Sequence, residues 1–171
     1  MASFKTQYVK QQVLVKESLT SRELINVVDY DSEQNINSIL LNKIKSKIGN
    51  KCNENGFIDR DSLQIISRSM GKINSSHFNG DISYNVSLEA NVCLPVQGSK
   101  LKCTVIGKNK IGVYALADPI HIILAAVHHE DSSVFDQVEK DDTILVEVIN
   151  YNFKLNSDNI RVIGKLLSKT K

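Results

Sequence analysis

The sequence predicts an α+β domain followed by a small, all-β, five-stranded barrel. Three observations predict this fold class. One segment has the apolar spacing of a helix face, the residues after it form short β-type runs divided by turns, and five further short runs without a long helix fill the end of the chain. With 171 residues and a 42% hydrophobic composition, the chain can bury ordinary cores in two small domains.

The first expected elements are a strand and a helix. Residues 8–15 are rich in β-branched side chains, and we expect a strand that residues 16–18 then break. Apolar residues next recur at the spacing of one helix face, at Ile36, Ile39, Leu40, Ile44 and Ile48. We expect Asp31 and Gln34 to cap the start of this helix and Gly49 to end it in the left-handed conformation.

Residues 51–95 follow a different pattern, in which short β-type runs alternate with turns. The longest run begins at Ile82, and its apolar and polar side chains alternate with a period of two. One face of this strand is therefore expected to pack on the helix, within an antiparallel sheet. We place the domain boundary at Pro95, so that residues 1–95 form the first domain and residues 96–171 the second.

The second domain carries five β-type runs at short intervals, which is typical of a small barrel. The runs are residues 101–106, 111–116, 120–124, 143–149 and 159–163. Residues 107–110 supply a hairpin turn, and Gly112 lies where a barrel strand bends or takes a bulge. The polar connection of residues 125–142 lies where five-stranded OB barrels carry a short helix or an insertion.

Composition and charge exclude several classes of function. The charged fraction is 23% and the formal net charge +2, so contact with nucleic acid must come from a local patch. No apolar run approaches the ~18 residues that span a bilayer, and the N-terminus is polar. The three cysteines have no CxxC spacing, which indicates buried free thiols. We therefore expect a soluble intracellular protein that has no contact with membranes.

No motif indicates catalysis, a cofactor or a metal, and we expect no active site in this chain. It has no Gly-rich phosphate loop and no nucleophile elbow. Residues 128–131, His-His-Glu-Asp, suggest a metal site, but neighbours on an extended chain point to opposite sides. Residues 29–40 resemble a calcium loop, but Gln34 and Leu40 stand where that loop needs glycine and glutamate.

The order of these parts resembles one family: the seventh subunit of eukaryotic RNA polymerase II, its counterparts in polymerases I and III, and the corresponding stalk subunit of archaeal RNA polymerase. The likeness runs through most of the chain. In the first domain it rests on the helix, on Gly56-Phe57, on the glycine-bounded residues 71–80 and on Pro95-Val96-Gln97-Gly98. In the second it rests on Ile111-Gly112-Val113-Tyr114, on Asp118-Pro119-Ile120 and on residues 159–164.

This resemblance implies a ribonucleoprotein-like docking domain followed by an OB barrel of the ribosomal-S-one type. It implies a non-catalytic stalk subunit of a multisubunit DNA-directed RNA polymerase, which supports transcription initiation and transcript handling. The implied partners are the largest polymerase subunits and the core, nascent single-stranded RNA, and a small helical fourth-subunit-type protein. The nucleus is implied for a cellular enzyme, and the virion or a cytoplasmic virus factory for a viral one. The composition, rich in Asn, Ile and Lys, favours a viral or protist source.

One candidate site is a basic and aromatic set around the first barrel hairpin. OB barrels bind single strands along a basic groove with aromatic side chains for stacking, so we expect weak, salt-sensitive and sequence-independent RNA binding. The alternative is a solvated strand face of lysines, with the aromatic as a core or partner contact. The set consists of Lys100, Lys102, Lys108, Lys110 and Tyr114.

A second candidate site, implied by the resemblance, is a pair of tip loops that dock on the polymerase body. The alternative is two ordinary turns at glycines. The docking set consists of Asn55, Gly56, Phe57, Gly71, Ser75, Ser76, His77 and Gly80.

Two other functions remain open from the sequence. A free-standing OB-fold RNA-binding protein in translation or RNA decay would have no need of the tip loops. A hydrolase or nuclease that uses residues 128–131 would contain bound metal.

Overall fold

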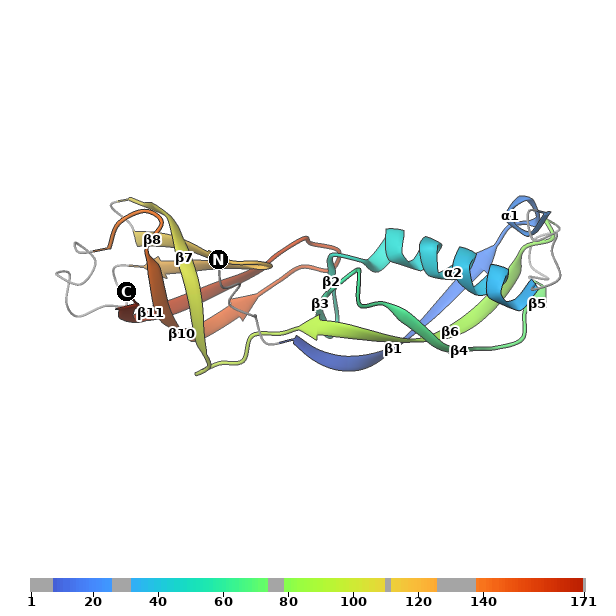
Figure 1. Cartoon of the computed structure of the whole chain (residues 1–171), viewed down its shortest axis with the longest axis horizontal. Helices are drawn as coiled ribbons and strands as arrows, with labels where there is room; N and C mark the ends of the chain where they lie inside the picture. Colours follow the sequence, from blue (N-terminus) through green and yellow to red (C-terminus); the bar gives the residue numbers. More distant parts are fainter. Residues whose placement is uncertain (1–7, 26–31, 74–78, 110–111, 126–137, 171) are drawn as a thin grey trace. The chain divides into compact units, whose positions relative to one another are not determined.

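The computed structural model describes residues 8–25, 32–73, 79–109, 112–125 and 138–170, and shows a mostly β protein with few helices (Figure 1). The chain divides into two compact units. The sheet unit contains Val9–Asn50 and Ile58–Val92, and the barrel unit contains Lys51–Phe57 and the chain from Cys93 onward. Pro95, the predicted boundary, lies two residues beyond Cys93, whereas Lys51–Phe57 groups with the barrel despite its early place in the sequence.

The first sheet is built around its longest central strand. Its order is β1-β6-β3-β2, with β4 and β5 also paired to β6. The pairs of β6 with β4 and with β5 are antiparallel. The strands are β1 (Tyr8–Leu19), β2 (Lys51–Asn53), β3 (Gly56–Ile58), β4 (Gln64–Arg68), β5 (Lys72–Ile73) and β6 (Ile82–Cys93).

Two helices accompany this sheet, the short α1 (Ser21–Ile25) and the longer α2 (Ser32–Ile48). Leu40 and Ile44 of α2 are fully buried and share a core cluster with the inward side chains of β6, among them Val86 and Leu88. The predicted packing of the helix on one face of the alternating strand is therefore observed (Figure 1). Area removed from water on this face is the main force that holds α2 in place.

The prediction that residues 16–18 break the first strand was wrong, because β1 continues to Leu19. Glu17 and Leu19 are both buried on the inward face of the strand. The charge of Glu17 is compatible with burial because the Nζ of Lys47 lies 2.7 Å from its carboxylate oxygens.

The end of α2 also differs from the prediction. The left-handed residue is Asn50, with a φ of 55°, and not Gly49. Gly49 is needed for a different reason, since a Cβ there would run into the backbone carbonyl oxygen of Lys45 and the side chain of Arg60. The side chains of Asp31 and Gln34, the predicted N-terminal caps, lie outside the described residues.

The second half of the chain forms a closed five-stranded barrel, as predicted. Its order is β10-β11-β9-β8-β7, and β10 pairs with β7 to close it. All pairs are antiparallel except that between β9 and β11, which is parallel. The strands are β7 (Lys100–Lys108), β8 (Gly112–Ala117), β9 (Ile120–Ala125), β10 (Thr143–Asn152) and β11 (Ile160–Thr170).

The last two strands are longer than predicted. The ladder between β10 and β11 runs from the pair of Thr143 with Thr170 to the pair of Asn152 with Arg161, across two register shifts. One shift leaves Ile149 of β10 without a partner in the ladder and the other leaves Leu167 of β11 without one, while the buried and exposed side chains of β11 keep alternating to Leu166. Hydrogen bonding to the neighbouring strand therefore extends β11 beyond its apolar run.

The barrel interior is filled by alternate side chains from all five strands. Gly112 is needed at one close approach, because a Cβ there would run into the backbone carbonyl oxygen of Leu124 on β9. The buried core residues of the strands are Leu101, Cys103, Val105, Val113, Ala115, Ile120, Ile122, Leu124, Ile144, Val146, Val148, Ile160, Val162 and Leu166.

The three cysteines are free and buried, as the sequence predicts. Burial raises the pKa of the Cys93 thiol to about 11 and that of Cys103 to about 12. Burial also raises the pKa of the Cys52 thiol. Thiols of this kind are small apolar core residues and poor nucleophiles.

Candidate nucleic-acid interface and docking loops

Tyr114 lies on the outer face of the barrel. In β8 its neighbours Val113 and Ala115 point into the core, so the alternation turns the Tyr114 ring outward, where it is 38% exposed. Its cross-strand partner on β9 is Ile123, which also points outward. The ring is therefore accessible to a ligand, as stacking on a base requires.

The structure separates the predicted lysines along β7. Lys100 begins the strand, and its cross-strand partner on β10 is Glu147, whose charge opposes its own. Lys108 ends the strand, next to Gly107, which is the cross-strand partner of Tyr114. Lys102 is exposed between these ends, and Lys110 lies outside the described residues. Lys108 lies at the Tyr114 end of the hairpin, but its cross-strand partner is the buried Val113, so strand alternation directs the Lys108 and Tyr114 side chains to opposite faces. Lys100 lies at the other end of β7.

An apolar row crosses the outer face beside Tyr114. Ile106 on β7 lies in a bulge next to the Gly107–Tyr114 pair, Ile123 is paired with Tyr114, and Ile163 on β11 is paired with Ile123. Ile106 and Ile163 are exposed. Four neighbouring strands therefore present one continuous row of large apolar side chains, which we call the outer row.

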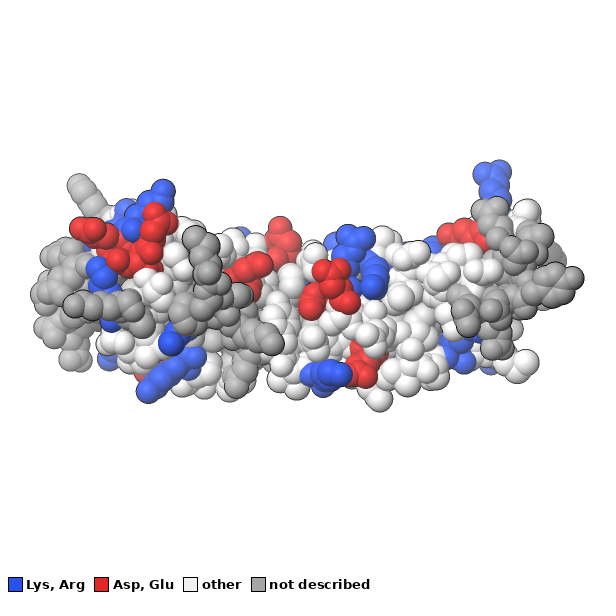
Figure 2. Space-filling model, in the orientation of Figure 1, with Lys and Arg blue, Asp and Glu red and all other residues white. Residues whose placement is uncertain are grey.

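Charges do not gather into one strong field on the face drawn in Figure 2. Lysine and arginine side chains are interspersed there with aspartate and glutamate over both units. This agrees with the formal net charge of +2, and it limits electrostatic attraction of nucleic acid on that face to local groups.

A cavity of about 170 Å³ opens in the connection from β10 to β11. The sequence patterns did not predict it, because residues 159–163 indicate only a closing strand. The available signal was a pair of aromatic residues two positions apart, Tyr151 and Phe153, followed directly by Lys154. The lining residues are Asn152, Phe153, Lys154, Ser157, Asp158, Asn159 and Arg161.

Three residues of the predicted docking set, Asn55, Gly56 and Phe57, belong to the segment that packs within the barrel unit. The Cys52 backbone N–H donates to the Ser157 carbonyl and the Asn156 N–H to the Cys52 carbonyl, both at 2.8 Å. Gly56 and Phe57 are buried, and Phe57 belongs to the barrel core cluster. Asn55 is exposed at the turn between β2 and β3. In this loop Asn55 is therefore the residue of the set that a partner can reach.

The other part of the docking set belongs to the sheet unit. Gly71 is required by space, because a Cβ there would lie 2.5 Å from the Ile82 side chain and 2.9 Å from the Tyr84 ring. Gly80 has a φ of 73°, which favours glycine. Ser75, Ser76 and His77 lie outside the described residues.

Large apolar side chains are exposed next to Gly71. Met70 is 87% exposed and Ile73 is 74% exposed. Both lie in or beside β5, which is at the same end of the sheet unit as α1 (Figure 1). Apolar side chains exposed this far are typical of contact surfaces when they cluster.

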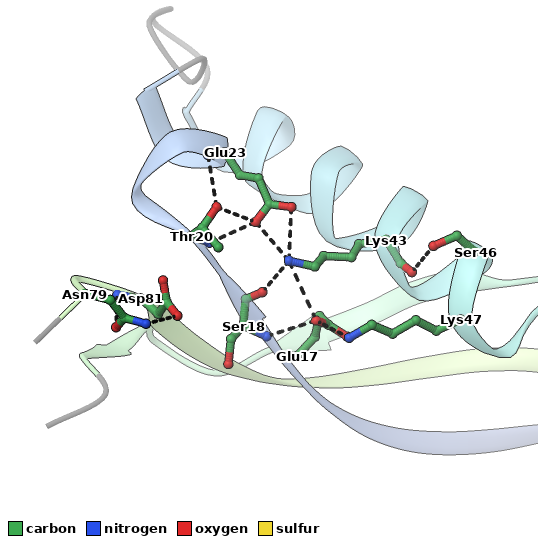
Figure 3. A network of polar contacts seen from close by, with 9 residues as sticks. All are labelled: Glu17, Ser18, Thr20, Glu23, Lys43, Ser46, Lys47, Asn79 and Asp81. Carbon is green, nitrogen blue, oxygen red and sulfur yellow. Dashed lines mark hydrogen bonds and ion pairs between the residues drawn. The ribbon is translucent and has the colours of Figure 1, made fainter. Parts of the chain in front are cut away.

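A network of polar contacts holds α1 at this end (Figure 3). Glu23 and Thr20 cap each other's backbone, with the Thr20 N–H 2.8 Å from the Glu23 Oε2. The Nζ of Lys43 donates to the Ser18 carbonyl and to Glu23, each at 2.8 Å. The Ser21 hydroxyl donates to the Asn79 carbonyl at 2.9 Å, which ties α1 to the turn at Gly80.

These contacts define the electrostatics of the network. The hydrogen bond from Lys43, and then that from the Thr20 N–H, lower the pKa of Glu23 to about 2. Glu23 therefore stays ionised at neutral pH and keeps the Lys43 ammonium in place.

The part of the chain that the structure describes holds no cluster suited to a metal. There, no group of three or more His, Cys, Asp or Glu side chains could hold a metal ion. Residues 128–131, which suggest a metal site in the sequence, lie outside that part. None of the described helices has both the length and the apolar character that crossing a membrane requires.

The structure is that of a mostly β protein with a closed five-stranded barrel. The outer surface of the barrel carries the exposed apolar side chains of the outer row. The chain is similar to a protein of Acanthamoeba polyphaga mimivirus named "Putative DNA-directed RNA polymerase subunit L376". The two are 28% identical over 147 residues, which cover 78% of this chain and 72% of the mimivirus protein. No family model matches the chain.

Proposed function

We propose that this chain is a non-catalytic stalk subunit of a multisubunit DNA-directed RNA polymerase. It docks on the polymerase body through its N-terminal part and contacts emerging RNA with its barrel. The similarity to the mimivirus protein carries this proposal, because a match over 78% of the chain extends beyond either unit alone. A shared barrel by itself would cover only the second half.

The topology supports an OB assignment for the barrel. Three consecutive strands, β7 to β9, form an antiparallel meander, β11 runs parallel to β9, and β10 closes on β7. This is a five-stranded Greek-key arrangement of the kind that OB folds use. The packing of α2 on an antiparallel sheet supports a ribonucleoprotein-like docking domain in the same way.

Docking through the sheet unit is supported by the exposed side chains of Met70 and Ile73 beside Gly71. Contact surfaces gain most of their affinity from a few apolar anchors that are desolvated on binding. The polar network of Lys43 and Ser21 holds α1 and the turn at Gly80 in place before a partner arrives. The partners are the largest polymerase subunits, with a small helical fourth-subunit-type protein.

RNA contact by the barrel is supported by the exposed Tyr114 ring and by Lys108 at the same end of the hairpin. One aromatic stack contributes roughly 1–3 kcal/mol, so binding through this face is weak. Lys100 and Lys102, on the rest of β7, add charge that salt screens. Tyr114→Ala lowers RNA affinity by about tenfold or more if the ring stacks on a base.

Purification of the tagged protein from its native source at moderate salt, followed by mass spectrometry, tests the proposal. Recovery of the two largest polymerase subunits in near-equal amounts supports a stalk subunit and identifies its polymerase. It would also decide between the nucleus and a virus factory as the site of action. Recovery of RNA with ribosomal or decay factors instead would identify a free-standing RNA-binding protein and overturn the proposal.

A further inference from the structure

We propose that the cavity between β10 and β11 holds one unstacked nucleotide of single-stranded RNA and favours bases with an exocyclic amino group over uracil. This inference rests on the proposed RNA contact and assigns it a specific subsite. It departs from the sequence-independent binding that the sequence alone predicts.

The size of the cavity selects a small ligand. Its volume of about 170 Å³ is below the ~300–1,000 Å³ of sites for drug-sized molecules and cofactors. A single base fits a space of this kind, whereas a dinucleotide cofactor does not.

The lining has the three chemical parts that recognition of one nucleotide requires. Phe153 supplies an aromatic ring, which already stacks on Tyr151 with ring centroids 6.4 Å apart. Lys154 and Arg161 supply positive charge for a phosphate, and the amides of Asn152 and Asn159 supply hydrogen-bond groups for a base edge.

Asp158 determines which bases fit. An ionised carboxylate only accepts hydrogen bonds, and its two oxygens retain acceptor capacity beyond the bond from the Asn159 amide. The amino groups of cytosine, adenine and guanine can donate to it, whereas uracil presents a carbonyl oxygen at the position of the cytosine amino group and has the ring N3–H, flanked by two carbonyl oxygens, as the donor on that edge.

The cavity is organised before a ligand binds. Two backbone hydrogen bonds to Cys52 pin Asn156 and Ser157, and the Ser157 hydroxyl donates to the Asn159 carbonyl at 2.9 Å. Asn156 takes a φ of 64°, which closes the turn. A loop held in this way loses little conformational entropy on binding, so weak contacts suffice.

The cavity continues the outer row on the barrel surface. Arg161 lies two residues before Ile163 on β11, with its side chain on the same outward face. From the strand spacing and rise, Arg161 lies roughly 12 Å from Tyr114 across β9 and β11. One strand of RNA can therefore contact Tyr114 and the cavity together, which favours RNA over a protein segment as the occupant.

Fluorescence anisotropy with short labelled oligoribonucleotides and the full chain tests this subsite. We expect oligocytidylate and oligoadenylate to bind more tightly than oligouridylate. Arg161→Gln and Phe153→Leu each weaken oligocytidylate binding about tenfold, the size of one lost stack or charge contact. Asp158→Asn removes the preference against uracil. Lys165→Gln is the matched control, because Lys165 lies on the same face of the same strand, outside the cavity, and changes affinity by less than about twofold.

Three outcomes would overturn the subsite, each in a distinguishable way. Unchanged RNA binding by the cavity variants, with a loss in Tyr114→Ala, leaves the barrel as an RNA binder but removes the subsite. Normal RNA binding with loss of a co-purifying protein makes the cavity a protein contact. No RNA binding by the unmodified chain refutes the RNA contact and the subsite together. A thermal melt of Phe153→Leu, in which leucine retains apolar contact with the core, excludes unfolding as the cause of weaker binding.

Discussion

Lys47 on α2 and Glu17 on β1 form an ion pair in which the Lys47 Nζ lies 2.7 Å from each carboxylate oxygen. Glu17 is 4% exposed, and the Nζ of Lys43 lies 3.9 Å from it as well. A carboxylate that is removed from water is tolerated only when such contacts compensate its lost hydration. The ion pair therefore joins α2 to the first sheet at Glu17, a charged side chain that is buried.

Lys47→Met leaves the buried Glu17 carboxylate with the Ser18 backbone N–H at 3.2 Å and the Lys43 ammonium at 3.9 Å. We expect a loss of about 1–2 kcal/mol in the free energy of unfolding, less than for a fully buried pair because the Lys47 side chain is more than half exposed. Urea unfolding followed by circular dichroism measures the loss. Lys45→Met, two residues earlier in the same helix, is the control and changes stability by less than ~0.5 kcal/mol. Equal stability of the two variants would contradict a role for the pair.

The lowered pKa of Glu23 predicts that the free energy of unfolding depends on pH, and that replacing Glu23 removes this dependence. Its pKa is lowered to about 2 in the folded chain by Lys43 and the Thr20 N–H. A lowered folded pKa contributes stability that is complete above the ordinary value of 4.5 and is lost as pH falls toward about 2. Since the Glu23 side chain is about one third exposed, solvent screening limits the contribution to about 1 kcal/mol.

Comparison of Glu23→Gln with the unmodified chain isolates this group from the other carboxylates. At pH 7 the variant is less stable by up to about 1 kcal/mol, and the difference narrows below about pH 4.5 as Glu23 becomes protonated. Thermal melts at several pH values measure it. A difference in stability that stays constant down to pH 2 would show that the interaction does not depend on the charge of Glu23.

Substitution by alanine is expected to destabilise the chain at one glycine near the first barrel hairpin and to be tolerated at another. Gly112→Ala places a Cβ against the backbone carbonyl of Leu124, which cannot rotate away, so we expect a loss of about 1–3 kcal/mol. Gly107→Ala meets no atom within 4 Å and stays within ~0.5 kcal/mol of the unmodified chain. Denaturant unfolding of both variants measures the contrast, and similar stabilities would refute the close approach at Gly112.

Docking through the sheet unit predicts that Met70→Ser with Ile73→Ser releases the chain from the polymerase. Loss of two apolar anchors lowers recovery of the large subunits by about tenfold or more, without a change in the thermal midpoint. Leu14→Ser is the control, because Leu14 is 76% exposed on β1 of the same unit. If the Leu14 variant were released as readily as the double variant, docking would not be specific to this end.

Much of the fold follows from local patterns. The alternation in residues 82–92 predicts which side chains of β6 face α2, and the five short runs predict the barrel, because the side-chain period of a strand is a local property. The outward position of Tyr114 between buried Val113 and Ala115 follows from the same period. The burial of the three free cysteines was predictable in this way too.

The tertiary structure decided what depends on distant neighbours. Lys47 stabilises Glu17 from thirty residues away, so β1 continues where its local sequence predicts a break. Pairing with β10 carries β11 through Gly164 and on to Thr170, where the sequence has no continuous apolar run to indicate a strand. The cavity of Phe153, Asp158 and Arg161 exists because Cys52, far earlier in the sequence, pins the loop through backbone hydrogen bonds. Local side-chain periodicity is enough to predict which residues face inward. Pairing between distant segments sets where strands end and where a ligand fits, because those contacts leave no periodic pattern in the sequence.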